Sequence, residues 1–474
     1  MGKNNQQRRA AKRKARVAAQ AASARPAGGA AAGEAGSAAQ LTEELMAGTA
    51  HQVHQHSRAD QARTLIITGA KVVGIPSALD DAVRDLVVFG GADGRGEELL
   101  ASREATVLLF EQIDTAYEHG WQPADLLHVV RREQSVRVAR LAGAVVVAHG
   151  LAGRAPSRAG QDWVDQLEGM SEVPLAGLVA EPGWNVLAHL GSRAAVWDSW
   201  HDILALVGHW ADIVPLQRLV PPPSSWGKAT AAPAGARKPS GHDPKKLTTI
   251  RALLAKAEAT EFTEEAEAFT AKAQDLMTRY AIDEALLSDE TDDATGVVSR
   301  RVRVDNPYAA TKAQLLATVG KINRVKTIWD DRHGIATVVG MPVDLDLAEM
   351  LFTSLLVQAT KAMTEAGAVS QGGHRLDRSP AFRRAFLLSY AHRIGERLSD
   401  AGTHAQQEES VQRGVNLLPV LARQSAAVEK EFDRLFPHTT TSGSKRVDAR
   451  GWQAGRAAAD RAVLARGRLD GQSA

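Results

Sequence analysis

The segment Asp243–Leu287 carries the pattern that most restricts how this chain can fold, because two helical stripes follow one another with a short break between them. Four apolar residues in its first half recur at the spacing of one helical face: Ile250, Leu253, Leu254 and Ala257. Thr263 is a good N-cap, and the acidic residues that follow it suit the positive end of a helix dipole. The break at Thr260–Phe262 leaves only a short connection, so the segment predicts two antiparallel helices.

The second helix of this hairpin has its own apolar stripe, formed by Ala266, Phe269, Ala273, Leu276, Met277 and Tyr280. Between Lys245 and Ser288 six Lys and Arg stand against eight Asp and Glu, so the hairpin is not itself a basic surface for nucleic acid. Three carboxylates could be taken for a metal or acid–base site: Glu258, Glu265 and Glu267. A carboxylate cluster alone has little specificity, and a solvated charged face is the better interpretation.

Four short motifs in this segment occur in a familiar order and spacing: IRALLAKAE at Ile250–Glu258, EEAEAFTAKAQ at Glu264–Gln274, LM at Leu276–Met277 and AID at Ala281–Asp283. With the lysine-rich entry before them, they resemble a bacterial and phage family known only as domain of unknown function 2786. The resemblance covers about a tenth of the chain. It implies a fold unit and a bacterial or mobile-element context, and it implies no reaction.

The composition limits the classes of protein that the chain can represent. With 474 residues there is room for two to four domains, and a hydrophobic content of 44% is ordinary for globular cores. The absence of cysteine excludes disulfides, thiolate metal sites and a cysteine nucleophile. No apolar run approaches the roughly 20 residues that span a bilayer, and the N-terminus lacks the apolar core of a secretory signal. We therefore expect a cytoplasmic protein with no membrane partner.

The net charge of +2 hides an uneven distribution. Residues 1–33 carry eight Lys and Arg and no acidic residue, whereas residues 439–474 carry seven basic and three acidic residues. The six basic residues at the centre of the N-terminal segment are Arg8, Arg9, Lys12, Arg13, Lys14 and Arg16. The segment is too polar and too simple in composition to bury a core, so we expect a disordered arm. It could bind a phosphate backbone through counterion release, or it could be a solubilising tail.

Residues 41–220 predict a helical domain. Helical periodicity covers Pro76–Phe89 and Glu97–His119, and a further helix is expected from Leu126 towards Ala148 after the turn at Gly120–Pro123. Two helices that meet at a tight turn could be a helix-turn-helix DNA reader, although such pairs are common in α-helical proteins. Four residues would then contact phosphates: Arg131, Arg132, Arg137 and Arg140.

Three histidines at the start of this region, His51, His54 and His56, invite comparison with a metal site. On a helix His51 and His54 share a face, but His56 points well away from His51 and no further ligand is evident nearby. A solvated polar face is the better interpretation, and we expect no metal and no cofactor.

Residues 221–243 are a Pro/Gly/Ala-rich linker by composition, and an α+β domain follows over residues 306–437. Val325–Trp329 and Ile335–Met341 predict strands of a β-hairpin, with a third strand at Leu417–Leu421. Helices are expected over Asn306–Asn323, from Pro342, from Pro380 to beyond Leu398, and over Ser425–Phe436. Three stretches here resemble the module that commonly follows the hairpin in its relatives: Phe352–Thr360, Phe382–Leu398 and Gly451–Ala462.

The helix that begins at Pro380 carries the richest group of charged residues. Arg383, Arg393 and Arg397 predict an anion-binding surface, with Arg393 and Arg397 one turn apart on the same face. Local acidic residues could instead pair with them. His392 and Glu396 could serve as acid and base, although a helical salt bridge is the more ordinary interpretation of this spacing.

These observations predict a multidomain, mainly α-helical chain in six parts: a disordered basic arm (1–40), a helical domain (41–220), a linker (221–243), a helical hairpin (244–288), an α+β domain with a small two- to three-stranded sheet (306–437) and a basic C-terminal segment with a short helix (438–474). Sequence motifs of P-loop ATPases, zinc proteases and esterases are absent. Two function classes stay open. One is a non-enzymatic module that binds nucleic acid or another polyanion, and the other is a hydrolase for a phosphate-bearing or other anionic substrate around His374, Arg383, Arg393 and Glu396.

Overall fold

The computed structural model describes residues 58–91, 95–171, 174–175, 180–191, 195–226, 244–259, 263–290, 296–366, 379–414, 416–439 and 448–461. The chain divides into two compact units, Met1–Ala62 and Arg63–Ala474, and the elements named below belong to the second. It is mainly α-helical with one small antiparallel sheet, which confirms the predicted fold class. The predicted basic arm and His51, His54 and His56 lie outside the described residues.

The N-terminal part is helical, as predicted. Its longer helices are α3 (Pro76–Gly91), α4 (Arg95–Glu118), α5 (Pro123–Glu133), α6 (Val136–Ala152) and α10 (Val196–Ala211). Short helices α7 (Ala155–Arg158), α8 (Gln161–Glu168) and α9 (Val186–Leu190) lie in the Gly- and Pro-containing stretch between α6 and α10. Large apolar side chains such as those of Trp121 and Trp200 are fully buried among these helices.

The prediction of one continuous helix from Leu126 towards Ala148 was wrong. The chain breaks between α5 and α6 at Gln134 and Ser135, and the side chain of Ser135 accepts a hydrogen bond from the backbone N–H of Val138. Ser135 is therefore the N-cap of a new helix. Pro123 occupies the first turn of α5, as expected.

The sheet contains β1 (Val298–Arg303), β2 (Lys326–Asp330) and β3 (Ile335–Gly340) in the order β1-β3-β2, with both pairs antiparallel. The predicted β2–β3 hairpin is confirmed. Gly334 adopts a φ of +69° in the turn, which glycine accepts at little cost. The third strand prediction at Leu417–Leu421 was wrong, because this segment begins helix α16 and the third strand is β1.

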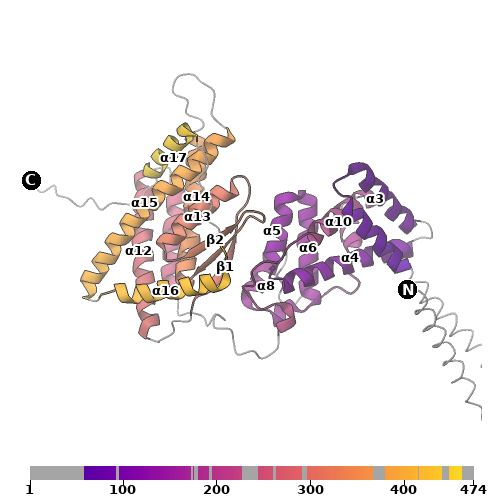
Figure 1. Ribbon diagram of the computed structural model, residues 1–474, viewed down its shortest axis with the longest axis horizontal. Coiled ribbons are helices and arrows are strands. Elements are labelled where there is room, and N and C mark those ends of the chain that lie inside the picture. Colours follow the sequence, from indigo (N-terminus) through magenta and orange to yellow (C-terminus); the bar gives the residue numbers. More distant parts are fainter. Residues whose placement is uncertain are drawn as a thin grey trace, which may run out of the picture. The chain divides into compact units, whose positions relative to one another are not determined.

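Helices cover both faces of the sheet, and every residue of the central strand β3 is buried. Because side chains alternate along a strand, Val338 lies in the main core, which also contains residues of α13 (Ala309–Ile322), α14 (Pro342–Ala366) and α15 (Pro380–Arg413). Val339 points the other way and packs against Val428 and Leu435 of α16 (Leu418–Leu435). Figure 1 shows α13 and α14 beside the sheet and α16 crossing it.

The hairpin predicted from the sequence is formed by α11 (Pro244–Ala259) and α12 (Thr263–Glu290). Ile250 and Leu254 of α11 pack against Met277 and Tyr280 of α12, and Leu347 of α14 completes this core. The hairpin therefore shares its apolar core with the first turns of α14.

The last described helix, α17 (Ala449–Arg461), lies against α15 at very short range. A Cβ atom added at Gly455 would stand 2.1 Å from the carbonyl oxygen of Phe386, and one added at Gly451 would stand 2.4 Å from that of Phe382. Ala458 and Ala459 are buried on the same helix. Small residues thus allow the backbones of α15 and α17 to approach each other closely.

Candidate functional site

The predicted anion-binding helix, α15, is positioned by a cap and an apolar stripe. The Ser379 hydroxyl accepts a hydrogen bond from the backbone N–H of Phe382 at 3.2 Å, and Pro380 occupies the first turn. Four residues of the expected apolar face are almost fully buried in the main core, which confirms that face: Phe386, Tyr390, Ile394 and Leu398. The charged residues between them therefore lie at the edge of the core.

Glu396 is the centre of the charged group on α15. Its carboxylate accepts a hydrogen bond of 2.6 Å from Arg393, lies 3.3 Å from Nδ1 of His392 and lies 3.5 Å from a guanidinium nitrogen of Arg456 in α17. The hydrogen bond from Arg393 is the main reason why the pKa of Glu396 lies below its ordinary value. A carboxylate held ionised in this way does not have the pKa near neutrality that suits a general base.

Arg397 contacts the backbone of α17. Its guanidinium donates a hydrogen bond to the carbonyl oxygen of Ala459, in the last turn of α17. A cation at this end complements the negative end of the helix dipole. Arg397 therefore helps to fix α17 against α15.

The three predicted anion-binding residues do not gather at one point. Arg383 is ten residues before Arg393 on the same helix, which corresponds to about 15 Å along the axis. His374, the fourth member of the proposed hydrolase site, lies outside the described residues. Anion binding by Arg383, Arg393 and Arg397 stays a prediction, and the observed contacts of the last two are with local groups.

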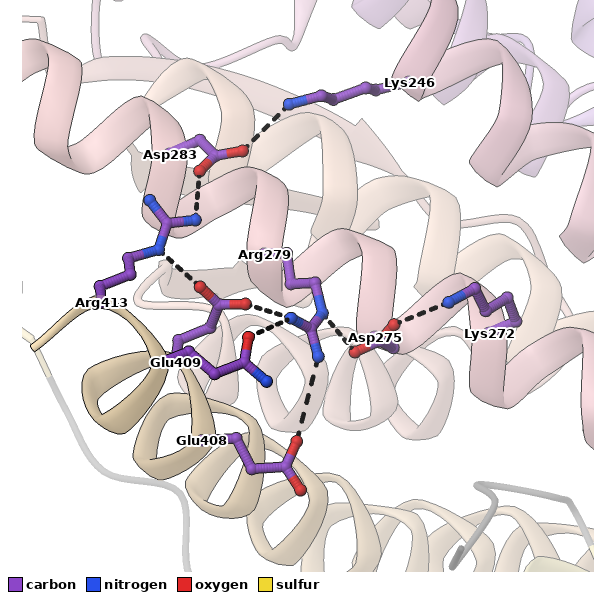
Figure 2. A network of polar contacts seen from close by, with 9 residues as sticks. Lys246, Lys272, Asp275, Arg279, Asp283, Glu408, Glu409 and Arg413 are labelled. Atoms are coloured by element: carbon purple, nitrogen blue, oxygen red, sulfur yellow. Dashed lines mark hydrogen bonds and ion pairs between the residues drawn. The ribbon is translucent and has the colours of Figure 1, made fainter.

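A second charged group connects the hairpin with the far end of α15, and Figure 2 shows its members. The Glu409 carboxylate of α15 is 4% exposed and accepts hydrogen bonds from Arg279 of α12 and, at 2.6 Å, from Arg413. Arg413 also donates to Asp283 at 2.6 Å, and Lys246 of α11 donates to the same carboxylate at 3.0 Å. Asp283, the acidic residue of the AID motif, thus joins α11, α12 and α15.

Two carboxylates of this network, those of Asp283 and Asp275, have pKa values below the ordinary value. Partial burial alone would raise the pKa of Asp283, but the hydrogen bonds from Lys246 and Arg413 bring it below its ordinary value. Partial burial would likewise raise the pKa of Asp275, but the hydrogen bonds from Arg279 and Lys272 bring it below its ordinary value. Because these pKa values are depressed in the folded state, the stabilisation is present at neutral pH and is lost as the pH falls through the folded-state values.

Replacing Glu409 with Ala is expected to destabilise the protein by about 1–2 kcal/mol, because two guanidinium groups lose a shared and buried acceptor. Each guanidinium keeps another carboxylate and is about a third exposed, which limits the loss. The matched control is Glu408→Ala, since Glu408 is 65% exposed and lies 4.0 Å from Arg279. Urea unfolding of both variants measures the difference, and equal stability of the two would contradict a structural role for the network.

A third charged group, not predicted from the sequence, is the most deeply buried of the three. Asp125 of α5 is fully buried and binds Arg301 of β1, whose side chain is only 2% exposed. Arg301 also donates to the carbonyl oxygens of Gly120, at 2.9 Å, and Gln217, at 2.6 Å. Arg303 donates to the other oxygen of Asp125 at 3.0 Å.

The alternation of β1 explains how this contact arises. Arg301 stands opposite Thr337 and Arg300 stands opposite Val338, so the two arginines leave the strand on opposite faces. Arg300 reaches Asp346 of α14, whereas Arg301 reaches α5. The strand VSRRVR was not predicted, and nothing in the sequence indicated Asp125 as the partner of Arg301.

The structure does not favour the helix-turn-helix alternative. Seven of the eleven residues of α5 are buried, which leaves this helix without a free face for a DNA groove. Arg132 donates to the carbonyl oxygen of Val304, and Arg137 binds Asp202 at 2.8–2.9 Å. Arg131 and Arg140 make no ion pair or hydrogen bond with another described residue.

Comparison with known families identifies the hairpin. Residues 245–284 match the family described as Protein of unknown function (DUF2786), which confirms the resemblance of α11 and α12. Comparisons with curated proteins and with solved structures found no match for the chain.

Two further searches concern only the residues described above. None of their helices combines the length and the hydropathy needed to cross a membrane. Within the same residues, no group of three or more His, Asp or Glu side chains is arranged to hold a metal ion.

Proposed function

We propose that this protein is a non-enzymatic, nucleic-acid-associated module that binds polyanions through its basic ends. The observation that carries the proposal is the charge of residues 1–33, which hold eight Lys and Arg and no acidic residue. A cationic segment of this kind binds a phosphate backbone by releasing condensed counterions, without reading sequence.

The charge of the rest of the chain also supports polyanion binding by the ends. Residues 34–438 carry a net charge of −10, so long-range repulsion opposes the approach of a polyanion to most of the body. The C-terminal segment 439–474 carries a net charge of +4, and its helix α17 is fixed to α15 by Arg397. Arg456 of α17 lies 3.5 Å from Glu396, which also binds Arg393. We propose Arg383, Arg393 and Arg397 as secondary contacts.

The hydrolase alternative receives less support. Its general base would be Glu396 or His392, but Glu396 is engaged by Arg393 and its pKa is lowered rather than raised. These contacts suit a surface ion pair between α15 and α17 better than a catalytic pair.

Deletion of residues 1–33 is expected to weaken binding to duplex DNA by at least about tenfold at moderate salt, because several phosphate contacts are lost together. Fluorescence anisotropy with a labelled duplex and with a single-stranded RNA of the same length measures the effect. A full-length variant with Gln at Arg8, Arg9, Lys12, Arg13, Lys14 and Arg16 should lose the same affinity.

The matched control is deletion of residues 17–33, which shortens the arm but removes only one basic residue, Arg25. This deletion should leave most of the affinity in place. Unchanged affinity after removal of residues 1–33 would mean that the arm is a solubilising tail and would contradict the proposed function.

A further inference from the structure

A cavity of about 790 Å³ lies in the N-terminal helical part, between one face of α6 and the segment that contains Trp184. Small-molecule sites typically enclose about 300–1,000 Å³ and combine an apolar lining with a few polar groups. The described residues that line the cavity belong neither to the basic arm nor to α15. Binding of a ligand in this cavity would therefore be a property separate from the proposed polyanion binding.

The wall formed by α6 is apolar and made of small side chains. Gly143, Ala144, Val147 and Ala148 line the cavity on successive turns of the helix. Ala144, Val147 and Ala148 are only partly buried, although apolar residues at the centre of a helical domain are usually covered. Small side chains at these positions leave the space open.

An aromatic pair also lines the cavity. The rings of Phe110 and Trp184 are stacked, with centroids 6.2 Å apart and an interplanar angle of 12°, and both residues line the cavity. An apolar body, aromatic or acyl, would pack against this pair and the α6 wall.

One end of the cavity is cationic. Arg131 of α5 and Arg137 and Arg140 of α6 line it together with Asp198 and Asp202 of α10. Arg137 is already neutralised, because its guanidinium lies 2.8 Å from Asp202 and 3.5 Å from Asp198. Arg131 and Arg140 have no such partner among the described residues, and with three arginines against two aspartates this end carries a net charge of +1. Glu181 is a further carboxylate in the lining of the cavity.

We infer that this cavity binds a small amphipathic organic anion, with its apolar body against α6 and its acidic group between Arg131 and Arg140. Guanidinium groups bind carboxylate or phosphate oxygens with two hydrogen bonds each when the geometry allows. The apolar walls supply the burial, and the two arginines supply the selectivity for an anion over a neutral molecule.

The first test uses 8-anilinonaphthalene-1-sulfonate, an aromatic anion whose fluorescence rises in apolar sites, with the full chain. It should bind at one saturable site, and octanoate should displace it at least about tenfold better than octanol, which has the same chain length and no charge. Equal displacement by octanol would overturn the role of the arginines. No saturable binding would overturn the site.

Variants locate the binding. The double variant Arg131→Gln with Arg140→Gln should weaken octanoate binding by at least about tenfold. The control is Arg103→Gln, because Arg103 is an exposed arginine on α4 that does not line the cavity. This control variant should bind octanoate as the unchanged chain does. Ala144→Trp should abolish probe binding by filling the space, and Ala148→Phe is a second filling variant if the first does not fold. Retained binding in a folded filling variant would overturn the site.

Deletion of residues 1–33 separates this inference from the proposed function. Probe binding should be unchanged after the deletion, even though DNA binding falls. Loss of probe binding with the arm would show that the anion binds there and not in the cavity.

Discussion

Replacing Asp125 with Ala is expected to lower the free energy of unfolding by about 3–5 kcal/mol, which is a large part of the stability of an ordinary domain. The carboxylate is fully buried and is the acidic partner of Arg301, whose guanidinium is itself almost fully buried. Removal of the carboxylate leaves a positive charge without an ionic partner in a medium that solvates it poorly. Asp125 also accepts a hydrogen bond of 3.1 Å from the backbone N–H of Gln122 at the start of α5.

The matched control for this prediction is Arg303→Ala. Arg303 binds the same carboxylate but is 26% exposed, and its removal leaves the Asp125–Arg301 pair intact. Its loss should therefore change the free energy of unfolding by only about 1 kcal/mol. Urea unfolding of the full chain compares the two variants. A loss below about 1 kcal/mol for Asp125→Ala would show that Arg301 finds other partners and that the buried pair contributes little.

Gly455→Ala is expected to destabilise the protein by about 3 kcal/mol, at the upper end of the range for an overpacked core. The added methyl group would stand 2.1 Å from the carbonyl oxygen of Phe386, and a backbone oxygen cannot rotate aside as a side chain can. Helix α17 would have to move away from α15. This movement would also weaken the hydrogen bond from Arg397 to Ala459.

The control for Gly455 is another helical glycine. A Cβ added at Gly402 of α15 meets no atom within 4 Å, so Gly402→Ala should stabilise the protein by about 0.5–1 kcal/mol through helix propensity alone. Thermal and urea unfolding should therefore move in opposite directions for the two variants. A neutral or stabilising Gly455→Ala would mean that α17 is not packed on α15 as described.

Elements whose pattern is local could be predicted from the sequence. The hairpin of α11 and α12 has two clear helical stripes, and the β2–β3 hairpin has strand residues on both sides of a turn that contains Gly334. Leu417–Leu421 misled the prediction, because a short apolar run does not distinguish a strand from the first turns of a buried helix. The strand β1 was missed because three of its six residues are arginines, which is unusual for a covered strand.

For the charged residues, too, local contacts could be predicted from the sequence and long-range contacts could not. The contacts of Glu396 with His392 and Arg393 join residues three and four apart on one helix, so the sequence was sufficient to anticipate them. Asp125 and Arg301 are 176 positions apart, and Arg397 and Ala459 are 62 apart. Such contacts depend on how helices and the sheet pack, which residue spacing does not encode. The cavity beside α6 has the same origin, since its aromatic pair comes from α4 and the segment before α9.

The measurement that tests the proposed function most directly is the salt dependence of DNA binding by the full chain and by the chain without residues 1–33. The logarithm of the binding constant falls with the logarithm of the salt concentration by about 0.9 for each phosphate contact on duplex DNA. If the eight basic residues of the arm make most of the contacts, its deletion should reduce the magnitude of the slope by at least about 3 units. Equal slopes for the two chains would place the phosphate contacts outside the arm and contradict the proposed function.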